Sequence, residues 1–195
     1  MKVLNELMEI ERRFLVDGRY DKPWRDGARV FNIQQHYVPF EAFTVVEGWM
    51  NGFGHPLTTM TEEEVDVWSS STWVIRLRKM NEQHILTCKS RQSHDSSLEL
   101  EWTVSKECFD AVLANGPFPH VLKTRYKWAA LDEHVWEIDE FEGALAGVVL
   151  AEIELSQSDQ AFETPEWVGH EVTGLESWSN NALSNMLSQK HAPQG

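Results

Sequence analysis

Residues 9–16 read Glu-Ile-Glu-Arg-Arg-Phe-Leu-Val, and this stretch decides the fold that the sequence predicts. Alternate side chains of an extended strand share a face. Glu9, Glu11 and Arg13 therefore lie on one face, and Ile10 and Phe14 lie on the other. The stretch predicts a strand over about 7–15 with one charged face and one apolar face.

The same alternation recurs in seven further segments, at about 31–38, 72–79, 83–89, 97–104, 121–128, 134–141 and 149–155. Short connections separate several of these strands, which favours an antiparallel sheet. All but the 31–38 segment place a polar or charged set on one face: Arg76 with Arg78, Thr87 with Lys89, Glu99 with Glu101, Lys123 with Arg125 and Lys127, Glu137 with Asp139, and Glu152 with Glu154.

A repeated charged face fits either a flat sheet with one side in water or a closed barrel with its charges inside. Periodicity does not separate the two, but the chemistry favours the barrel. Neighbouring carboxylates such as Glu9 and Glu11 repel unless a cation lies between them, and Mg²⁺ or Mn²⁺ takes carboxylate oxygens. Arg and Lys on nearby strands would bind a polyphosphate. We predict a mainly β, α+β fold: an eight-stranded antiparallel β tunnel with a charged interior and a few flanking helices.

Two helices are predicted outside the barrel strands. One covers about 106–114 with Ser105 as its N-cap, and the other covers about 177–189. The stretch 40–70 has weak periodicity, and we expect it to be a long insertion in a single domain spanning 1–195. Within this stretch, Glu62-Glu63-Glu64 is predicted to be a solvated loop.

The charge balance limits the partners. The net charge is −14, and residues 128–195 contain 13 acids but only one basic residue, Lys190. Such a chain repels duplex nucleic acid and anionic membranes, so we expect neither as a partner. No apolar run approaches the roughly 20 residues that span a bilayer, and the acidic N-terminus does not resemble a signal peptide. Cys88 and Cys108 are expected to be free thiols, which favours a cytoplasmic protein.

The N-terminal motif resembles the Glu-x-Glu-x-Lys signature of the CYTH superfamily, the triphosphate tunnel metalloenzymes, and in particular its short bacterial members. The run 168–173 is similar to the stretch that precedes the last helix of that family. The likeness covers nearly the whole chain and continues in order through Gln34-Gln35-His36-Tyr37, Arg76-Leu77-Arg78, Thr87-Cys88-Lys89-Ser90, Glu99-Leu100-Glu101, Lys123-Thr124-Arg125-Tyr126, Glu137-Ile138-Asp139-Glu140-Phe141 and Leu150-Ala151-Glu152-Ile153-Glu154.

The resemblance implies an enzyme that holds a triphosphate by basic side chains and a divalent metal by carboxylates. The implied metal ligands are Glu9, Glu11, Asp139, Glu152 and Glu154, with Glu152 and Glu154 across the tunnel from the first two. The implied phosphate-binding residues are Arg13, Arg76, Arg78, Lys89, Lys123 and Arg125. The implied catalytic carboxylates are Glu99 and Glu101, which would hold these cations or orient the attacking water, and Glu137 and Asp139, which would complete the metal site or position the water.

Three departures from the family pattern bear on substrate choice. Arg13 stands where the signature ends in Lys, and Val74 stands where many members carry Glu. The run Trp178-Ser179-Asn180-Asn181 has no cation, whereas the final helix of the family often begins with lysines.

The leading hypothesis is a metal-dependent hydrolase of a triphosphate, with inorganic tripolyphosphate favoured over a nucleoside triphosphate. Two alternatives stay open: a class IV-type adenylate cyclase or thiamine triphosphatase, and a non-catalytic module that binds polyphosphate or nucleotides. The aromatic residues on the apolar faces are interpreted as outer packing, and they make a homodimer plausible.

Overall fold

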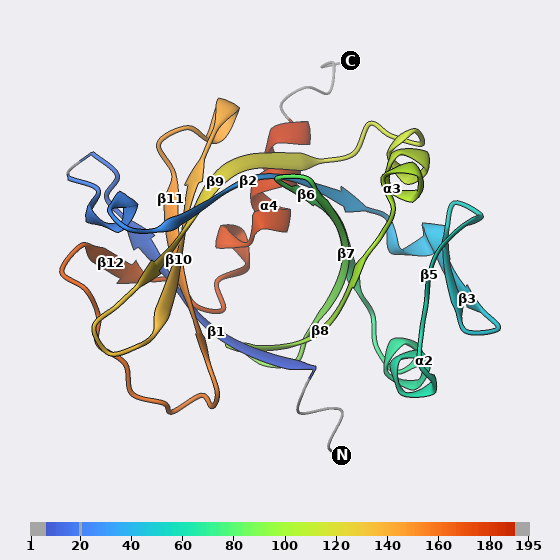
Figure 1. Ribbon diagram of the computed structural model, residues 1–195, viewed down its shortest axis with the longest axis horizontal. Helices are drawn as coiled ribbons and strands as arrows, with labels where there is room; N and C mark the ends of the chain where they lie inside the picture. The colour runs from blue at the N-terminus through green and yellow to red at the C-terminus, as the bar shows by residue number, and fades with distance from the viewer. Residues whose placement is uncertain (1–6, 20, 190–195) are drawn as a thin grey trace.

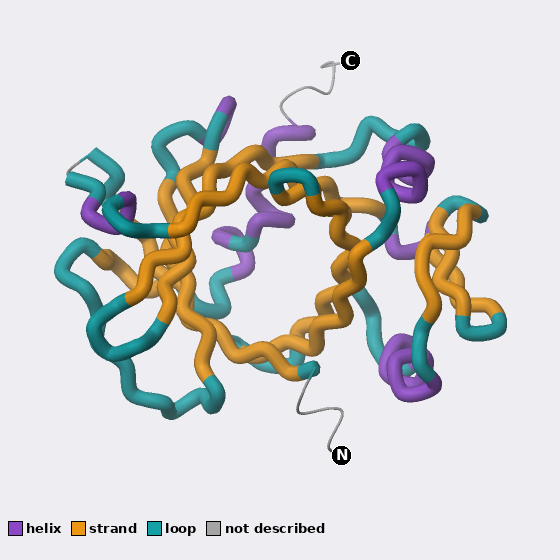
Figure 2. Tube along the Cα trace, viewed as in Figure 1, coloured by secondary structure: helices purple, strands orange, loops and turns teal. Residues whose placement is uncertain are grey.

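The computed structural model describes residues 7–19 and 21–189, and eight of its strands close into an antiparallel barrel (Figures 1 and 2). Around the barrel the order is β11-β10-β9-β2-β6-β7-β8-β1, and pairing of β1 with β11 closes it. The predicted fold class and all eight predicted strands are confirmed. The strands are β1 (Met8–Val16), β2 (Arg29–Val38), β6 (Val74–Met80), β7 (Gln83–Arg91), β8 (Ser96–Thr103), β9 (His120–Ala129), β10 (Val135–Phe141) and β11 (Val149–Leu155).

The register corrects one expectation about the charged residues. Glu152 and Glu154 were expected across the tunnel from Glu9 and Glu11. Instead β11 lies directly beside β1, with Glu154 opposite Glu11 and Glu152 opposite Arg13. The alternation of residue types shows which face of a strand a side chain occupies, but not which strands pair with one another. It therefore could not place these carboxylates around the barrel.

The outer face of the barrel is apolar and covered in two places. Against β6, β7 and β8 lies a cluster that includes Leu77, Leu86 and Leu100, which are at most 1% exposed. Against β1, β10 and β11 lies a second cluster built around Trp24 and Trp136, both fully buried. The outward packing predicted for aromatic residues is therefore seen at these two tryptophans.

The segment between β2 and β6 folds beside the barrel (Figure 1). It contains a short 3₁₀ turn (Phe40–Ala42) and a separate antiparallel sheet of β3 (Phe43–Val46), β4 (Trp49–Gly52) and β5 (His55–Thr59), followed by the helix α2 (Glu62–Ser69). The loop predicted at Glu62–Glu64 is wrong, because these residues form the first turn of α2. Thr61 and Glu64 make a reciprocal capping box, and acidic side chains suit a helix N-terminus.

The C-terminal elements close one end of the barrel. The helix α4 (Asn180–Gln189) packs Leu183 against Val121, Phe141 and Leu150, which lie at one end of the inward-facing rows of β9, β10 and β11. It starts three residues later than predicted, because Ser179 is extended and its hydroxyl accepts a hydrogen bond from the Ala182 N–H.

The remaining elements connect or cover the barrel strands. The predicted helix after Ser105 is confirmed as α3 (Lys106–Leu113), and none of the helices in the described part of the chain is long and apolar enough to cross a membrane. The short strand β12 (Val168–Glu171) pairs with the end of β1. Three further 3₁₀ turns are η1 (Pro23–Arg25), η3 (Gly143–Leu145) and η4 (Glu176–Trp178).

Candidate functional site

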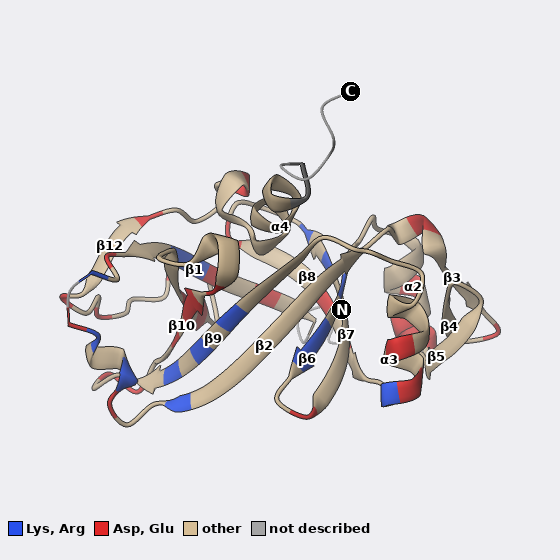
Figure 3. Ribbon diagram, turned by 90° about the horizontal axis from the view of Figure 1, so that it is seen from above, with Lys and Arg blue, Asp and Glu red and all other residues tan. Residues whose placement is uncertain are grey.

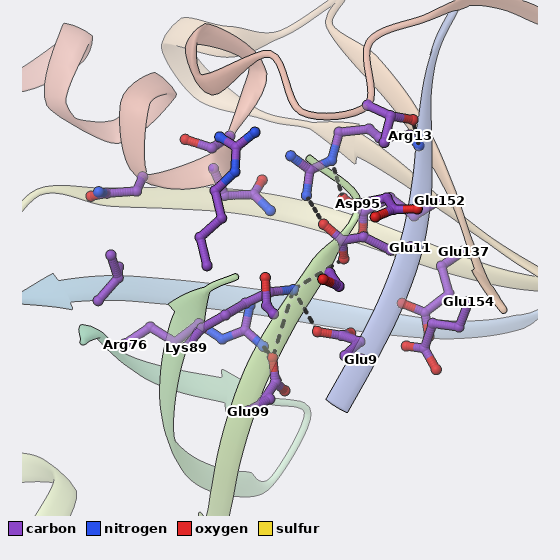
Figure 4. Close-up of a pocket in the computed structure, with 18 of the residues that line it drawn as sticks. Glu9, Glu11, Arg13, Arg76, Lys89, Asp95, Glu99, Glu137, Glu152 and Glu154 are labelled. Atoms are coloured by element: carbon purple, nitrogen blue, oxygen red, sulfur yellow. Dashed lines mark hydrogen bonds and ion pairs between the residues drawn. The ribbon is translucent and has the colours of Figure 1, made fainter. Parts of the chain in front are cut away.

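The barrel encloses a cavity of about 490 Å³ whose wall carries both signs of charge. Figure 3 marks basic positions along β9 and on β6, and Figure 4 shows the charged groups facing one another. The basic lining residues are Arg13, Arg76, Arg78, Lys89, Arg91, Arg125 and Lys127. The acidic lining residues are Glu9, Glu11, Asp95, Glu99, Glu101, Glu137, Glu152, Glu154 and Glu176.

Lys89 joins the carboxylates of β1 and β8. Its ammonium contacts Glu9, lies 3.1 Å from Glu11 Oε2 and lies 3.8 Å from Glu99 Oε2 (Figure 4). Burial alone would lower the pKa of Lys89, but the charges of these carboxylates raise it above its usual range. Burial also raises the pKa of Glu9, although Lys89 opposes that shift. The group is a compact cluster of one cation and several acids.

Arg13 bridges neighbouring strands. Its Nε donates to Glu152 Oε1 at 2.6 Å, and its Nη2 donates to Glu11 Oε1 at 2.9 Å. The planar guanidinium holds two carboxylates at once, which a single ammonium cannot do with the same fixed directions. Arg13 thus links β1 to β11 inside the cavity.

Arg76 and Arg78 are held by the two carboxylates predicted on β8. Arg76 Nη2 lies 3.2 Å from Glu99 Oε1, and Arg78 Nη2 lies 2.7 Å from Glu101 Oε2. The Thr87 hydroxyl donates to the same Glu101 oxygen at 3.0 Å. Glu99 and Glu101 therefore fix the direction of two arginines that face the cavity.

Arg125 forms the second buried centre. Its guanidinium donates to both oxygens of Asp139 at 2.6 Å and also contacts Glu137 and Glu152. Lys123 Nζ donates to Asp139 Oδ2 at 2.6 Å. Burial lowers the pKa of Lys123 to about 8.

Two predicted site residues are buried outside the cavity lining. Asp139 is 0% exposed and Lys123 is 2% exposed, and neither lines the cavity. They form an ion pair, and Asp139 also binds Arg125. The structure brings the other predicted residues together in the cavity lining: Glu9, Glu11, Arg13, Arg76, Arg78, Lys89, Glu99, Glu101, Arg125, Glu137, Glu152 and Glu154.

The carboxylates of β1 and β11 offer the donor set that a hard divalent cation prefers. Burial and the neighbouring charges of Glu9 and Glu137 raise the pKa of Glu154 to about 7, so negative charge is concentrated here. In the described ranges no three acidic, His or Cys side chains converge closely enough to hold a metal ion. Lys89 instead bridges Glu9 and Glu11. The residue types fit a divalent cation, and binding would require Lys89 to release these carboxylates.

The sequence pattern did not predict the parts of the lining that come from loops, where Ser93, Asp95 and Thr173 lie. The run from Trp178 to Asn181 was noted for its lack of a cation, and the structure places Ser179, Asn180 and Asn181 in the lining. Loops carry no alternation, so no periodic signal could assign these residues to an inner face. Tyr37 on β2 also lines the cavity, and its place within the Gln34–Tyr37 motif was the available signal.

The fold and the cavity define a closed antiparallel β-barrel with an interior of paired cations and carboxylates. The inorganic triphosphatase of Nitrosomonas europaea is 33% identical over 180 residues, which cover 91% of this chain and 97% of that protein. The inorganic triphosphatase of Acetivibrio thermocellus is 34% identical over 113 residues, which cover 56% of this chain and 70% of that protein.

A solved structure shares the architecture. The crystal structure of the inorganic triphosphatase NE1496 is 27% identical, with a TM-score of 0.54, and the match covers 90% of this chain and 93% of that one. No family model matches the chain. The extent of the likeness to the Nitrosomonas protein shows that the chain belongs to the CYTH superfamily of triphosphate tunnel metalloenzymes.

Proposed function

We propose that this protein hydrolyses a triphosphate, with inorganic tripolyphosphate as the favoured substrate and Mg²⁺ or Mn²⁺ as the cofactor. The observation that carries the proposal is the enclosed cavity in which five cations, Arg13, Arg76, Arg78, Lys89 and Arg125, form ion pairs with inward-facing carboxylates of other strands. Two relatives named inorganic triphosphatase support the same reaction.

The basic residues would bind the phosphate oxygens. Arg76 and Arg78 lie side by side on β6, and Glu99 and Glu101 fix their directions. Guanidinium groups suit bidentate contacts to phosphate, and positioned cations stabilise charge on the equatorial oxygens as the terminal phosphoryl group is transferred. Lys123 and Asp139 would act indirectly by holding Arg125 in place.

Glu9, Glu11, Glu152 and Glu154 are the proposed metal ligands. A divalent cation held there would supply positive charge to the triphosphate oxygens. Lys89, which contacts Glu9 and Glu11, would then be released to bind phosphate.

Glu101 is the proposed carboxylate that orients the attacking water. Its Oε2 binds Arg78 and Thr87, and its Oε1 has no partner within the part of the chain that the structure describes. An oriented carboxylate with a free oxygen can accept a proton from water beside the terminal phosphorus. Glu137, which contacts Arg125 and Lys127, would keep those two cations in place.

Product analysis tests the reaction. Tripolyphosphate, ATP and thiamine triphosphate are each incubated with the protein and with Mg²⁺ or Mn²⁺. Release of orthophosphate, fastest from tripolyphosphate, is expected. Formation of pyrophosphate and cyclic nucleotide from ATP would replace the proposal by a cyclase. Binding without turnover at either metal would replace it by a binding module.

Glu9→Gln tests the metal assignment. The change keeps the size of the side chain but removes the charge that a divalent cation needs, so turnover should fall at least 100-fold (about 3 kcal/mol in the barrier). Glu63→Gln is the matched control, because Glu63 is exposed on α2 outside the barrel. Equal turnover of Glu9→Gln and the wild type would contradict the assignment.

The setting of the enzyme is a further part of the proposal. Cys88 and Cys108 are both free, which supports a reducing, cytoplasmic compartment.

Val46 and Trp49 face each other on the β3–β4 hairpin and are 58% and 48% exposed, which supports a homodimer. Analytical ultracentrifugation would contradict the dimer if it found a single 22.5 kDa species at all concentrations.

A further inference from the structure

Two histidines lie side by side on the outer face of the barrel. His36 on β2 is directly opposite His120 on β9, and the two strands are neighbours (Figure 3). The Tyr37 N–H donates to the Pro119 carbonyl at 2.9 Å, so the next pair, His36 and His120, is a non-hydrogen-bonded pair. Opposite side chains lie closest in pairs of this kind. The ring centroids are 5.2 Å apart, and the ring planes differ by 31°.

Each ring has an Nε2 that is available as an acceptor. His120 Nδ1 lies 3.3 Å from the carbonyl oxygen of Phe118, which can only accept, so Nδ1 carries the proton and Nε2 carries a lone pair. His36 Nε2 is buried and has no hydrogen-bond partner among the residues that the structure describes. Buried N–H groups without an acceptor are rare in folded proteins. We therefore place the proton of His36 on Nδ1 and a lone pair on Nε2.

The surroundings keep His36 neutral at physiological pH. Burial and, after it, the neighbouring His120 ring lower the pKa of His36 to about 4. Within the described ranges, no carboxylate contributes to this shift, so nothing nearby stabilises an imidazolium. The neutral imidazole is the form that binds a metal ion, because the proton and the metal compete for the same lone pair.

We propose that His36 and His120 form a binding site for Zn²⁺ or a similar divalent transition-metal ion, which their two Nε2 atoms would hold. Two imidazoles that share one tetrahedral Zn²⁺ at Zn–N distances of about 2.1 Å place their ring centroids roughly 5 Å apart, close to the observed separation. His120 is exposed and its ring can turn toward the half-buried His36. No third His, Cys, Asp or Glu joins the pair in the described part of the chain, so water would complete the coordination.

This site is separate from the proposed Mg²⁺ or Mn²⁺ site in the cavity. His36 and His120 alternate with residues of the inner face, such as Tyr37 in the cavity lining and Val121 beneath α4. Imidazole nitrogens favour Zn²⁺, Ni²⁺ and Cu²⁺, whereas carboxylates favour Mg²⁺ and Mn²⁺. The metal would join β2 to β9 on the outside of the barrel, and the inference does not depend on the proposed function.

Calorimetric titration with Zn²⁺ in excess Mg²⁺ tests the site, because Mg²⁺ competes for carboxylates but poorly for imidazoles. His120→Gln and His36→Gln each remove one ligand, and each should weaken Zn²⁺ binding at least tenfold. His84→Gln is the matched control and should bind Zn²⁺ as the wild type does. His84 is also a half-buried histidine on a barrel strand, but its ring packs against Phe109.

Two further readouts identify the ligands without measuring activity. Cu²⁺ binds nitrogen ligands more tightly than Zn²⁺ does, and its electron paramagnetic resonance spectrum should show coupling to two imidazole nitrogens in the wild type and in His84→Gln, but not in His120→Gln. Saturating Zn²⁺ should raise the Tm of the wild type and of His84→Gln but not that of His120→Gln, because only the folded chain holds the two rings together.

The exposed ligand makes the test decisive. Because His120 is exposed, His120→Gln should have the Tm of the wild type in metal-free buffer, and loss of Zn²⁺ binding in this variant then reports the ligand and not the fold. A wild-type protein that binds no Zn²⁺ would overturn the proposal. Equal Zn²⁺ affinity of the wild type and His120→Gln would overturn it as well, because the bound ion would then lie elsewhere on the chain.

Discussion

Arg13 is a proposed phosphate-binding residue that also contributes to the stability of the barrel. Its guanidinium joins Glu11 and Glu152 at 2.9 and 2.6 Å across the β1–β11 pairing that closes the barrel. A lysine stands at this position in the family signature. The arginine fork can hold both carboxylates at once, so this chain has a rigid bridge where an ammonium would serve as a point charge.

The change Arg13→Lys is expected to weaken that bridge. A lysine ammonium lacks the planar fork that gives Glu11 and Glu152 separate contacts in fixed directions, so both largely buried contacts are weakened. The free energy of unfolding should fall by about 1–2 kcal/mol in urea titrations. Arg19→Lys is the control, because Arg19 pairs with Asp17 at an exposed site where ion pairs contribute little. Equal stability of the two variants would contradict the bridging role.

At the scale of elements, the structure separates what periodicity can predict from what it cannot. The eight barrel strands could be predicted because all of them except β2 alternate between a polar or charged interior and an apolar exterior. The short strands β3, β4 and β5 could not, because tight turns with left-handed residues such as Glu47 and Phe53 interrupt the pattern every few residues. The capping box at Thr61 was a readable signal for α2.

The same limit applies to the candidate site. Most of its charged residues were predicted, since they share strand faces. Periodicity could not distinguish Lys123 and Asp139, which are buried outside the cavity lining, from Arg125, which lines the cavity, because all three belong to inward-facing rows. Depth within a barrel depends on strand tilt and neighbouring side chains, which one strand does not encode.

Helix α4 should contribute to stability through Leu183. This residue is 5% exposed and packs over the inward apolar residues at one end of the barrel, so Leu183→Ala leaves a cavity there. The cost should be about 2–4 kcal/mol in denaturant titrations. Met186→Ala on the same helix is the control, because Met186 is 45% exposed and its loss should cost less than about 0.5 kcal/mol. If both changes cost the same, α4 does not close the barrel as described.

The turn η1 is attached to β10 by one carboxylate. Glu140 accepts hydrogen bonds from Lys22 at 2.6 Å, Trp24 at 3.1 Å and Arg25 at 2.8 Å. Burial would raise the pKa of Glu140, but these three donors together lower it to about 2. The folded state therefore binds a proton on Glu140 less readily than the unfolded chain does.

A pKa lowered by folding gives stability that is present above the unfolded value of 4.5 and is lost as the pH falls toward 2. Glu140→Gln should cost about 1–2 kcal/mol at pH 7, an amount reduced for the solvent exposure of Arg25. The difference from the wild type should shrink below pH 4.5 and nearly vanish near pH 2. Urea titrations across this range measure it, and a difference independent of pH would contradict the ion-pair explanation.

At the scale of the whole molecule, the negative net charge opposes the binding of an anionic substrate. The chain carries a net charge of −14, and the cavity lining itself has nine acidic against seven basic residues. A triphosphate approaching such a protein is repelled at long range, and favourable contacts arise only once it lies among the oriented cations. A divalent cation on the carboxylates would cancel this formal excess of negative charge in the cavity lining.

This arrangement predicts an unusual response to salt. Screening lengths fall from roughly 30 Å at 0.01 M to about 8 Å at 0.15 M, which weakens the long-range repulsion more than the short contacts within the cavity. At constant Mg²⁺, the association rate of tripolyphosphate measured by stopped flow should rise about two- to fivefold over this range. A protein that attracts its substrate by a basic surface shows the opposite trend. A rate that falls with salt would therefore mean that local cations, and not the net charge, govern the approach of the substrate.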